Sequence, residues 1–167
     1  MVPVSAKTWR RYDTYLIRRM GPESYHRAGY LLDELSAYCS GARTDLACYD
    51  YFVASNRDGK GWKSQLSNGH EEMAVFALAM AMAADRTPGS FRSEARKEQF
   101  MAVVAALVEN AVHLESQLCD EQRFPEYGKA ANPRISLQDL LRTNPDFAQM
   151  RAWLDRKFGT QWYSRRR

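Results

Sequence analysis

The 167-residue sequence has little of what marks several classes of protein. It contains three cysteines, Cys39, Cys48 and Cys119, and no C-x-x-C pair, which argues against a disulfide framework and against a zinc ribbon. Its longest uninterrupted apolar run extends from Met73 to Ala84, well short of the roughly 20 residues that span a bilayer. The opening residues lack the apolar core of a signal peptide. We therefore expect a reduced, cytoplasmic protein that does not associate with membranes.

Glycine and proline are also scarce, with nine and six residues, which excludes a collagen-like or low-complexity chain. Hydrophobic residues make up 45% and charged residues 26% of the chain, as is usual for globular proteins. A chain of this length can bury a sufficient core in one unit. We expect a single domain over residues 1–167, of which 160–167 form a basic, aromatic tail.

Strand-like alternation of apolar and polar residues is nearly absent, whereas helical periodicity recurs along the chain. The pattern predicts an all-α fold, a single-domain bundle of six or seven helices. Helices are expected at about Ser5 to Met20, Pro22 to Gly41, Thr44 or Asp45 to Val53, Gly69 to Asp85, Ser93 to Cys119, Ser136 to Arg142, and Asn144 to Phe158. The helix that begins at Gly69 is apolar on every side, which is typical of the central helix of a bundle.

None of the patterns that carry catalysis or metal binding is complete. The loop 58–64 ends in Lys-Ser, but no glycine stands directly before Lys63, as a phosphate loop requires. The triplet that begins at His70 lacks the second histidine of H-E-x-x-H. Glu109 and His113 lie four apart, whereas a di-iron helix spaces this pair three apart. We predict no enzyme, no cofactor and no metal, although a catalytic site assembled from distant helices would escape such spacing rules.

The net charge of +4 is unevenly distributed along the chain. Residues 1–27 carry six basic and two acidic groups, a net charge of +4. Residues 92–167 carry thirteen basic and ten acidic groups, a net charge of +3. Residues 28–91, with five basic and eight acidic groups, sum to −3. Such asymmetry is compatible with a polyanionic partner.

Basic residues stand beside aromatic ones at both ends of the chain. On the first expected helix, Trp9 and Tyr12 belong to an apolar stripe, and the basic residues of the opposite side lie within about 40° of one another. Phosphates attract cations, and unstacked bases stack on aromatic rings, as they could on Trp162 and Tyr163 of the tail. We expect single-stranded RNA, or DNA, to be bound by Lys7, Arg11, Arg18, Arg165, Arg166 and Arg167.

Two stretches resemble the small helical subunit of type III-B CRISPR effector complexes. Leu66, Asn68, Gly69, Ala74 and Phe76 are similar to that family's apolar-x-x-Asn-Gly segment and the helix that follows it, with the spacing before Asn68 one residue short. The run Trp-Leu-Asp-Arg-Lys-Phe near the C-terminus, 153–158, is similar to the family's closing Trp-Leu-basic-basic-aromatic helix.

The resemblance implies a non-catalytic subunit of an antiviral ribonucleoprotein that lines a guide–target channel beside a repeating backbone protein. It therefore implies protein partners as well as nucleic acid. The competing interpretation is a compact inhibitor or immunity-type protein of a mobile element, which acts through protein contacts alone. The salt dependence of binding separates the two, because phosphate contacts weaken steeply with salt.

Overall fold

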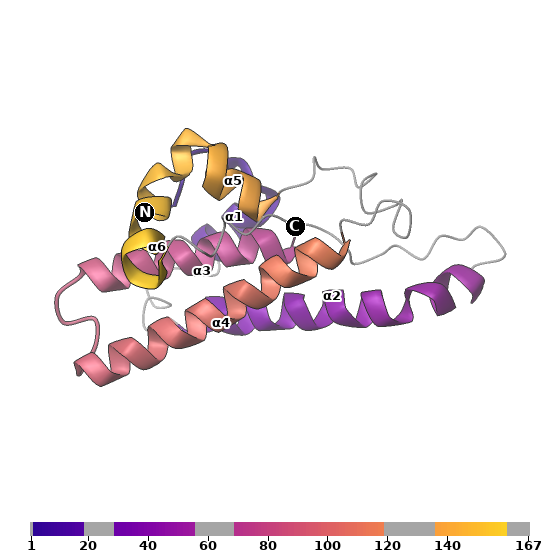
Figure 1. Ribbon diagram of the computed structural model, residues 1–167, viewed down its shortest axis with the longest axis horizontal. Helices are drawn as coiled ribbons and strands as arrows, with labels where there is room; N and C mark the ends of the chain where they lie inside the picture. The colour runs from indigo at the N-terminus through magenta and orange to yellow at the C-terminus, as the bar shows by residue number, and fades with distance from the viewer. Residues whose placement is uncertain (1, 19–28, 56–68, 119–135, 160–167) are drawn as a thin grey trace.

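The computed structural model describes residues 2–18, 29–55, 69–118 and 136–159. Within these ranges all regular elements are helical and no strand occurs, which confirms the all-α fold class (Figure 1). The long helices are α2 (Tyr30–Ser55), α3 (Gly69–Arg86) and α4 (Glu94–Leu118). The short ones are α1 (Arg10–Tyr12), α5 (Leu137–Thr143) and α6 (Ala148–Phe158). The expected tail, 160–167, lies outside the described residues.

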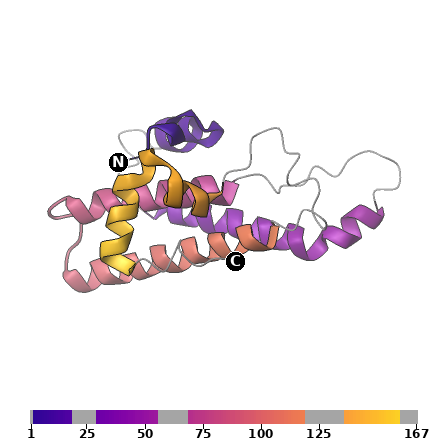
Figure 2. The same cartoon turned by 45° about the horizontal axis from the view of Figure 1, so that its top comes forward.

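Helix α3 is the centre of the bundle. Helices α2 and α4 pack against it and against each other, and α6 packs on another part of its surface (Figures 1 and 2). Thirteen of its eighteen residues are buried, because alanine, methionine and other apolar side chains occupy every side of the helix. The prediction that this segment is the buried central helix is therefore confirmed.

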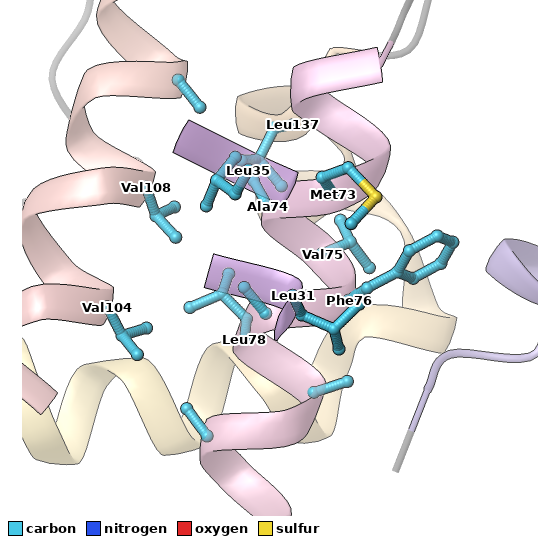
Figure 3. Packing of buried hydrophobic residues seen from close by; sticks show 14 of the residues in the cluster. Leu31, Leu35, Met73, Ala74, Val75, Phe76, Leu78, Val104, Val108 and Leu137 are labelled. Carbon is cyan, nitrogen blue, oxygen red and sulfur yellow. The ribbon is translucent and has the colours of Figure 1, made fainter. Parts of the chain in front are cut away.

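The core forms where side chains from several helices converge on α3. Leu31 and Leu35 of α2, Val104 and Val108 of α4, and Leu137 of α5 are buried against it (Figure 3). Burial of this apolar surface supplies the main favourable contribution to folding. In the part of the chain that the structure describes, no helix combines the length and the apolar character needed to cross a membrane.

Helix α2 is one continuous helix through Gly41, whereas the sequence predicted a helix that ends there and a second that begins at Thr44 or Asp45. Thr44 does not cap a new helix, because its hydroxyl donates to the carbonyl of Ser40 within the same helix at 3.0 Å. Ala42 and Asp45 are buried on the inner side of α2. Packing on both sides of Gly41 outweighs the roughly 1 kcal/mol that a glycine costs inside a helix.

The N-terminal segment is not the single helix that was expected from Ser5 to Met20. It consists of a 3₁₀ turn over Ser5–Thr8, the short α1 and a π-helical stretch over Asp13–Arg18. Trp9 interrupts the helix with an extended backbone, φ −70° and ψ 146°. Its ring lies 6.1 Å from that of Phe76 and 6.3 Å from that of Phe147, centroid to centroid, so contacts with distant residues hold the local backbone out of helical geometry.

The C-terminal helices begin and end close to where their capping residues predicted. The Ser136 hydroxyl accepts from the backbone N–H of Asp139 at 3.1 Å, as an N-cap does. Pro145 opens the 3₁₀ turn Pro145–Phe147 that leads into α6. Gly159 follows α6 with φ +79°, a backbone conformation that residues other than glycine rarely adopt.

Candidate functional site

Asp85, one residue before the end of α3, joins three helices at one end of the bundle. Its Oδ1 lies 3.0 Å from Lys97 Nζ of α4 and 2.9 Å from Lys157 Nζ of α6. Its Oδ2 accepts a hydrogen bond from Trp153 Nε1 of α6 at 2.9 Å. We call these four residues the Asp85 knot. Although burial alone raises the pKa of Asp85, the hydrogen bonds from Lys157, Trp153 and Lys97 hold it well below its ordinary value, so the carboxylate is ionised at neutral pH.

Three exposed arginines surround this end of the bundle. Arg86 follows Asp85 in α3, Arg92 lies in the turn between α3 and α4, and Arg156 precedes Lys157 in α6. The last turn of α6 lies beside the α3–α4 connection in both views (Figures 1 and 2). None of the three has a hydrogen-bond or ion-pair partner among the described residues. We call Arg86, Arg92 and Arg156 the arginine cluster.

The other arginines whose side chains the structure describes all contact protein groups. Their partners are Glu72 and Tyr38 for Arg11, Asp13 for Arg18, Asn110 for Arg43, Gln99 for Arg96, Asp139 for Arg142, and the carbonyls of Leu141 and Arg142 for Arg151. Within the described ranges, the arginines without a hydrogen-bond or ion-pair partner in the protein therefore lie at one end of the bundle only.

Aromatic rings accompany the arginine cluster. Phe91 precedes Arg92 and packs on Phe100 with ring centroids 5.3 Å apart. Phe158 packs edge to face on Trp153 with centroids 5.8 Å apart. Phe91 and Phe158 are half-buried, so part of each apolar ring is exposed at this end of the bundle.

The structure does not place the predicted basic residues of the N-terminal segment on one helix face. Lys7 is exposed in the 3₁₀ turn, before the interruption at Trp9. Arg18 is 77% exposed and pairs with Asp13 at 2.7 Å. Because Trp9 breaks the helix, the expected common face does not form. Arg165, Arg166 and Arg167 lie outside the described residues, as does the loop 58–64.

Arg11 was expected to point to solvent and instead lies in the interior. Its side chain is 14% exposed, Nη1 lies 3.0 Å from Glu72 Oε1, and Nε donates to the Tyr38 hydroxyl at 3.1 Å. Although burial alone lowers the pKa of Arg11, the hydrogen bond to Tyr38 and the charge of Glu72 raise it on balance. Arg11 therefore links the N-terminal segment to α3 through Glu72. Helical periodicity could not predict this contact, because Glu72 is 61 positions away in the sequence.

The first turn of α3 forms a second polar group beneath that segment. His70, Glu71 and Glu72 are all buried, with at most 1% exposure, although three successive polar residues normally indicate surface. His70 Nε2 lies 3.1 Å from Glu71 Oε1. Burial, which disfavours imidazolium, lowers the pKa of His70 to about 4, and the charge of Arg11 acts in the same direction. His70 is therefore neutral at physiological pH.

His70 makes stability depend on pH in a defined window. The unfolded chain binds a proton to this histidine below about pH 6.5, whereas the folded protein does so only near pH 4. The free energy of unfolding is therefore expected to fall, by at most about 1.4 kcal/mol per pH unit, as pH drops from 6.5 toward 4. Urea unfolding of His70→Gln between pH 7 and pH 5 should show a flatter profile than the wild type.

The control for this prediction is His113→Gln, because His113 is exposed on α4. Its profile should follow that of the wild type. An equal slope in all three proteins would show that the buried imidazole does not control acid sensitivity.

Within the ranges that the structure describes, the other residues that could have carried chemistry do not assemble a centre. Cys39 is buried, and burial raises the pKa of its thiol to about 11, so it is a small core residue. Glu109 and His113 are exposed on α4. Among the described residues, no group of three or more histidine, cysteine or acidic side chains is arranged to hold a metal ion.

The sequence did not single out Arg86 or Arg92 as candidate contacts, and Arg156 drew notice only as part of the basic C-terminal segment and of the run 153–158 that carries the family resemblance. Arg86 and Arg156 are separated by 70 positions, and no periodicity relates them. The run Asp-Arg-Lys, 155–157, was the one local signal, because it places two consecutive cations in the last turn of an expected helix.

No family model, curated protein or solved structure matches the chain.

Proposed function

We propose that the protein is a non-catalytic helical subunit that binds single-stranded nucleic acid, RNA in preference to DNA, within a ribonucleoprotein complex. The observation that carries this proposal is the arginine cluster, three exposed guanidinium groups at one end of the bundle that have no partner among the described residues. A guanidinium group presents a planar fork of donors that matches phosphate oxygens. Contacts of this kind supply most of the affinity of proteins for nucleic acid.

The aromatic rings beside the cluster favour a single strand over a duplex. Unstacked bases stack on aromatic side chains, and each such contact contributes about 1–3 kcal/mol. Phe91 immediately precedes Arg92 in the chain, Phe158 follows Arg156 by two residues, and both rings are partly exposed. The predicted contacts Arg165, Arg166 and Arg167 of the basic, aromatic tail remain part of this proposal, and they lie outside the described residues.

The resemblance to the small subunit of type III-B CRISPR complexes supports the same class of function. Its second stretch, 153–158, forms most of α6 and carries two knot residues and Arg156. Ala74 and Phe76 of its first stretch are buried in α3, where core packing alone accounts for them. In this proposal the protein also contacts protein partners of the complex and contributes no catalytic residue.

The arginine cluster is tested by removing its charge. Arg86→Gln combined with Arg156→Gln should weaken binding of a labelled single-stranded oligouridylate at least about tenfold and flatten the salt slope by about 0.7 for each phosphate that is no longer neutralised. Fluorescence anisotropy at two salt concentrations measures both quantities. The matched control is Arg43→Gln combined with Arg142→Gln, which removes the same charge from exposed residues that have partners.

Equal effects in the two double variants would show that net charge, and not the cluster, controls binding. A third double variant, Lys7→Gln with Arg18→Gln, tests the basic residues predicted from the N-terminal segment. If the wild type does not bind at low salt, alone or with its co-purifying partners, the proposal fails and the inhibitor or immunity-type protein becomes the better interpretation.

A further inference from the structure

The charged residues of the Asp85 knot stand next to exposed arginines in the sequence. Asp85 is followed by Arg86, Lys97 is preceded by Arg96, and Lys157 is preceded by Arg156. Each of the three charged knot residues, on three different helices, therefore has an arginine as its immediate neighbour in the chain.

The two sets of side chains point in different directions. Neighbours on a helix project about 100° apart, so a residue that points into the knot leaves its neighbour pointing outward. The knot side chains of Asp85, Lys97 and Lys157 are 11%, 23% and 35% exposed, whereas the three neighbouring arginines are exposed. Arg96 has a long contact with Gln99, at 3.5 Å.

From this arrangement we infer that Asp85 is a positioning residue for nucleic-acid binding, which holds Arg86, Arg96 and Arg156 of three helices together as contacts for the phosphates of one strand. The inference rests on the proposed function and adds how the binding surface is assembled. Asp85 itself does not touch the ligand, because a carboxylate would repel phosphate.

Electrostatics explains why the carboxylate is needed. Lys97 Nζ and Lys157 Nζ both lie about 3 Å from the same oxygen atom, Asp85 Oδ1. Without the negative charge between them, the two ammonium groups repel each other. We then expect the last turn of α6 to move away from α4 and to carry Arg156 with it. The hydrogen bond from Trp153 does not require the charge, since the oxygen of an asparagine side chain also accepts it.

The substitution Asp85→Asn distinguishes a positioning role of Asp85 from simple charge attraction between protein and nucleic acid, because the two explanations predict opposite changes in affinity. The variant raises the net charge by one, so attraction alone predicts tighter binding of polyanions. Positioning predicts weaker binding. We expect the Kd for the labelled oligouridylate to rise about tenfold, as when a single phosphate is no longer bound. Anisotropy is measured at a temperature at which circular dichroism shows both proteins folded.

A second variant covers the case in which Asp85→Asn does not fold. Asp85→Glu keeps the charge and moves the carboxylate by one methylene, so attraction alone predicts an unchanged Kd and positioning predicts a higher one. In a background that combines Arg86→Gln, Arg96→Gln and Arg156→Gln, Asp85→Asn should weaken binding no further, because residues that act through one another are non-additive.

The outcomes distinguish the inference from the proposed function. A wild type that does not bind the oligouridylate overturns both. A wild type that binds, with an Asp85→Asn or Asp85→Glu variant that binds as tightly or more tightly, leaves the proposed function standing and overturns the positioning role. An equal weakening by Asp85→Asn in the presence and absence of Arg86, Arg96 and Arg156 also overturns it.

Discussion

Phe76→Ala is expected to lower the free energy of unfolding by about 3–5 kcal/mol, the usual cost of deleting a packed aromatic side chain. Phe76 is 1% exposed at the centre of α3 (Figure 3). Its ring also contacts those of Trp9 and Tyr12, at centroid distances of 6.1 and 6.2 Å. The substitution therefore leaves a cavity and removes the surface on which the N-terminal segment packs. Urea unfolding followed by far-UV circular dichroism measures the decrease.

The control for this prediction is Val103→Ala on α4, where the side chain is 49% exposed. A change within about 0.5 kcal/mol is expected there, as for most surface substitutions. A decrease below about 1 kcal/mol for Phe76→Ala would contradict the central position of α3.

Arg11→Ala is the second substitution with a large expected effect. It leaves Glu72, whose side chain is 2% exposed, without the guanidinium that faces it at 3.0 Å. Removing one partner of a buried ion pair typically costs about 3–5 kcal/mol, because an uncompensated charge stays in the interior. We expect a decrease of that size in urea unfolding. Under conditions that keep the variant folded, the proposed binding of RNA should be largely preserved, because Arg11 is held inside the protein.

The same segment provides a matched control in Arg18→Ala. Arg18 and Asp13 pair at 2.7 Å but are 77% and 53% exposed, and surface pairs contribute about 0–1 kcal/mol. The two arginines thus differ in burial and share the same chemistry. Similar decreases from both substitutions would contradict the interior position of Arg11. Replacing Arg11 by Met and Glu72 by Leu together should cost less than Arg11→Ala, since no buried charge is then left unpaired.

Much of the fold could be predicted from local sequence. Helix α3 was recognised because its residues are apolar in every direction, and α5 because a serine stands where an N-cap is needed. These signals depend on neighbours within one or two helical turns. The prediction was wrong where a local signal competed with packing. Gly41 resembles a helix end, but buried residues on either side of it keep α2 continuous.

The candidate site was less predictable than the fold. The sequence indicated that the chain carries an excess of basic residues near its ends, and that no catalytic pattern is present. It did not show which of these residues are neutralised. Arg11 and Arg156 look alike in the sequence, yet one faces Glu72 and the other has no partner among the described residues.

The sequence by itself therefore determined the helical class, the central helix and several helix ends, because periodicity and capping operate over a few consecutive residues. Only the tertiary structure decided which charges are paired. Trp153 and Asp85 are 68 positions apart, and Arg11 and Glu72 are 61 apart. Pairs at such separations form only when helices dock. The charge that the protein presents to a partner is what remains after that pairing, so it depends on how α3, α4, α6 and the N-terminal segment pack against one another.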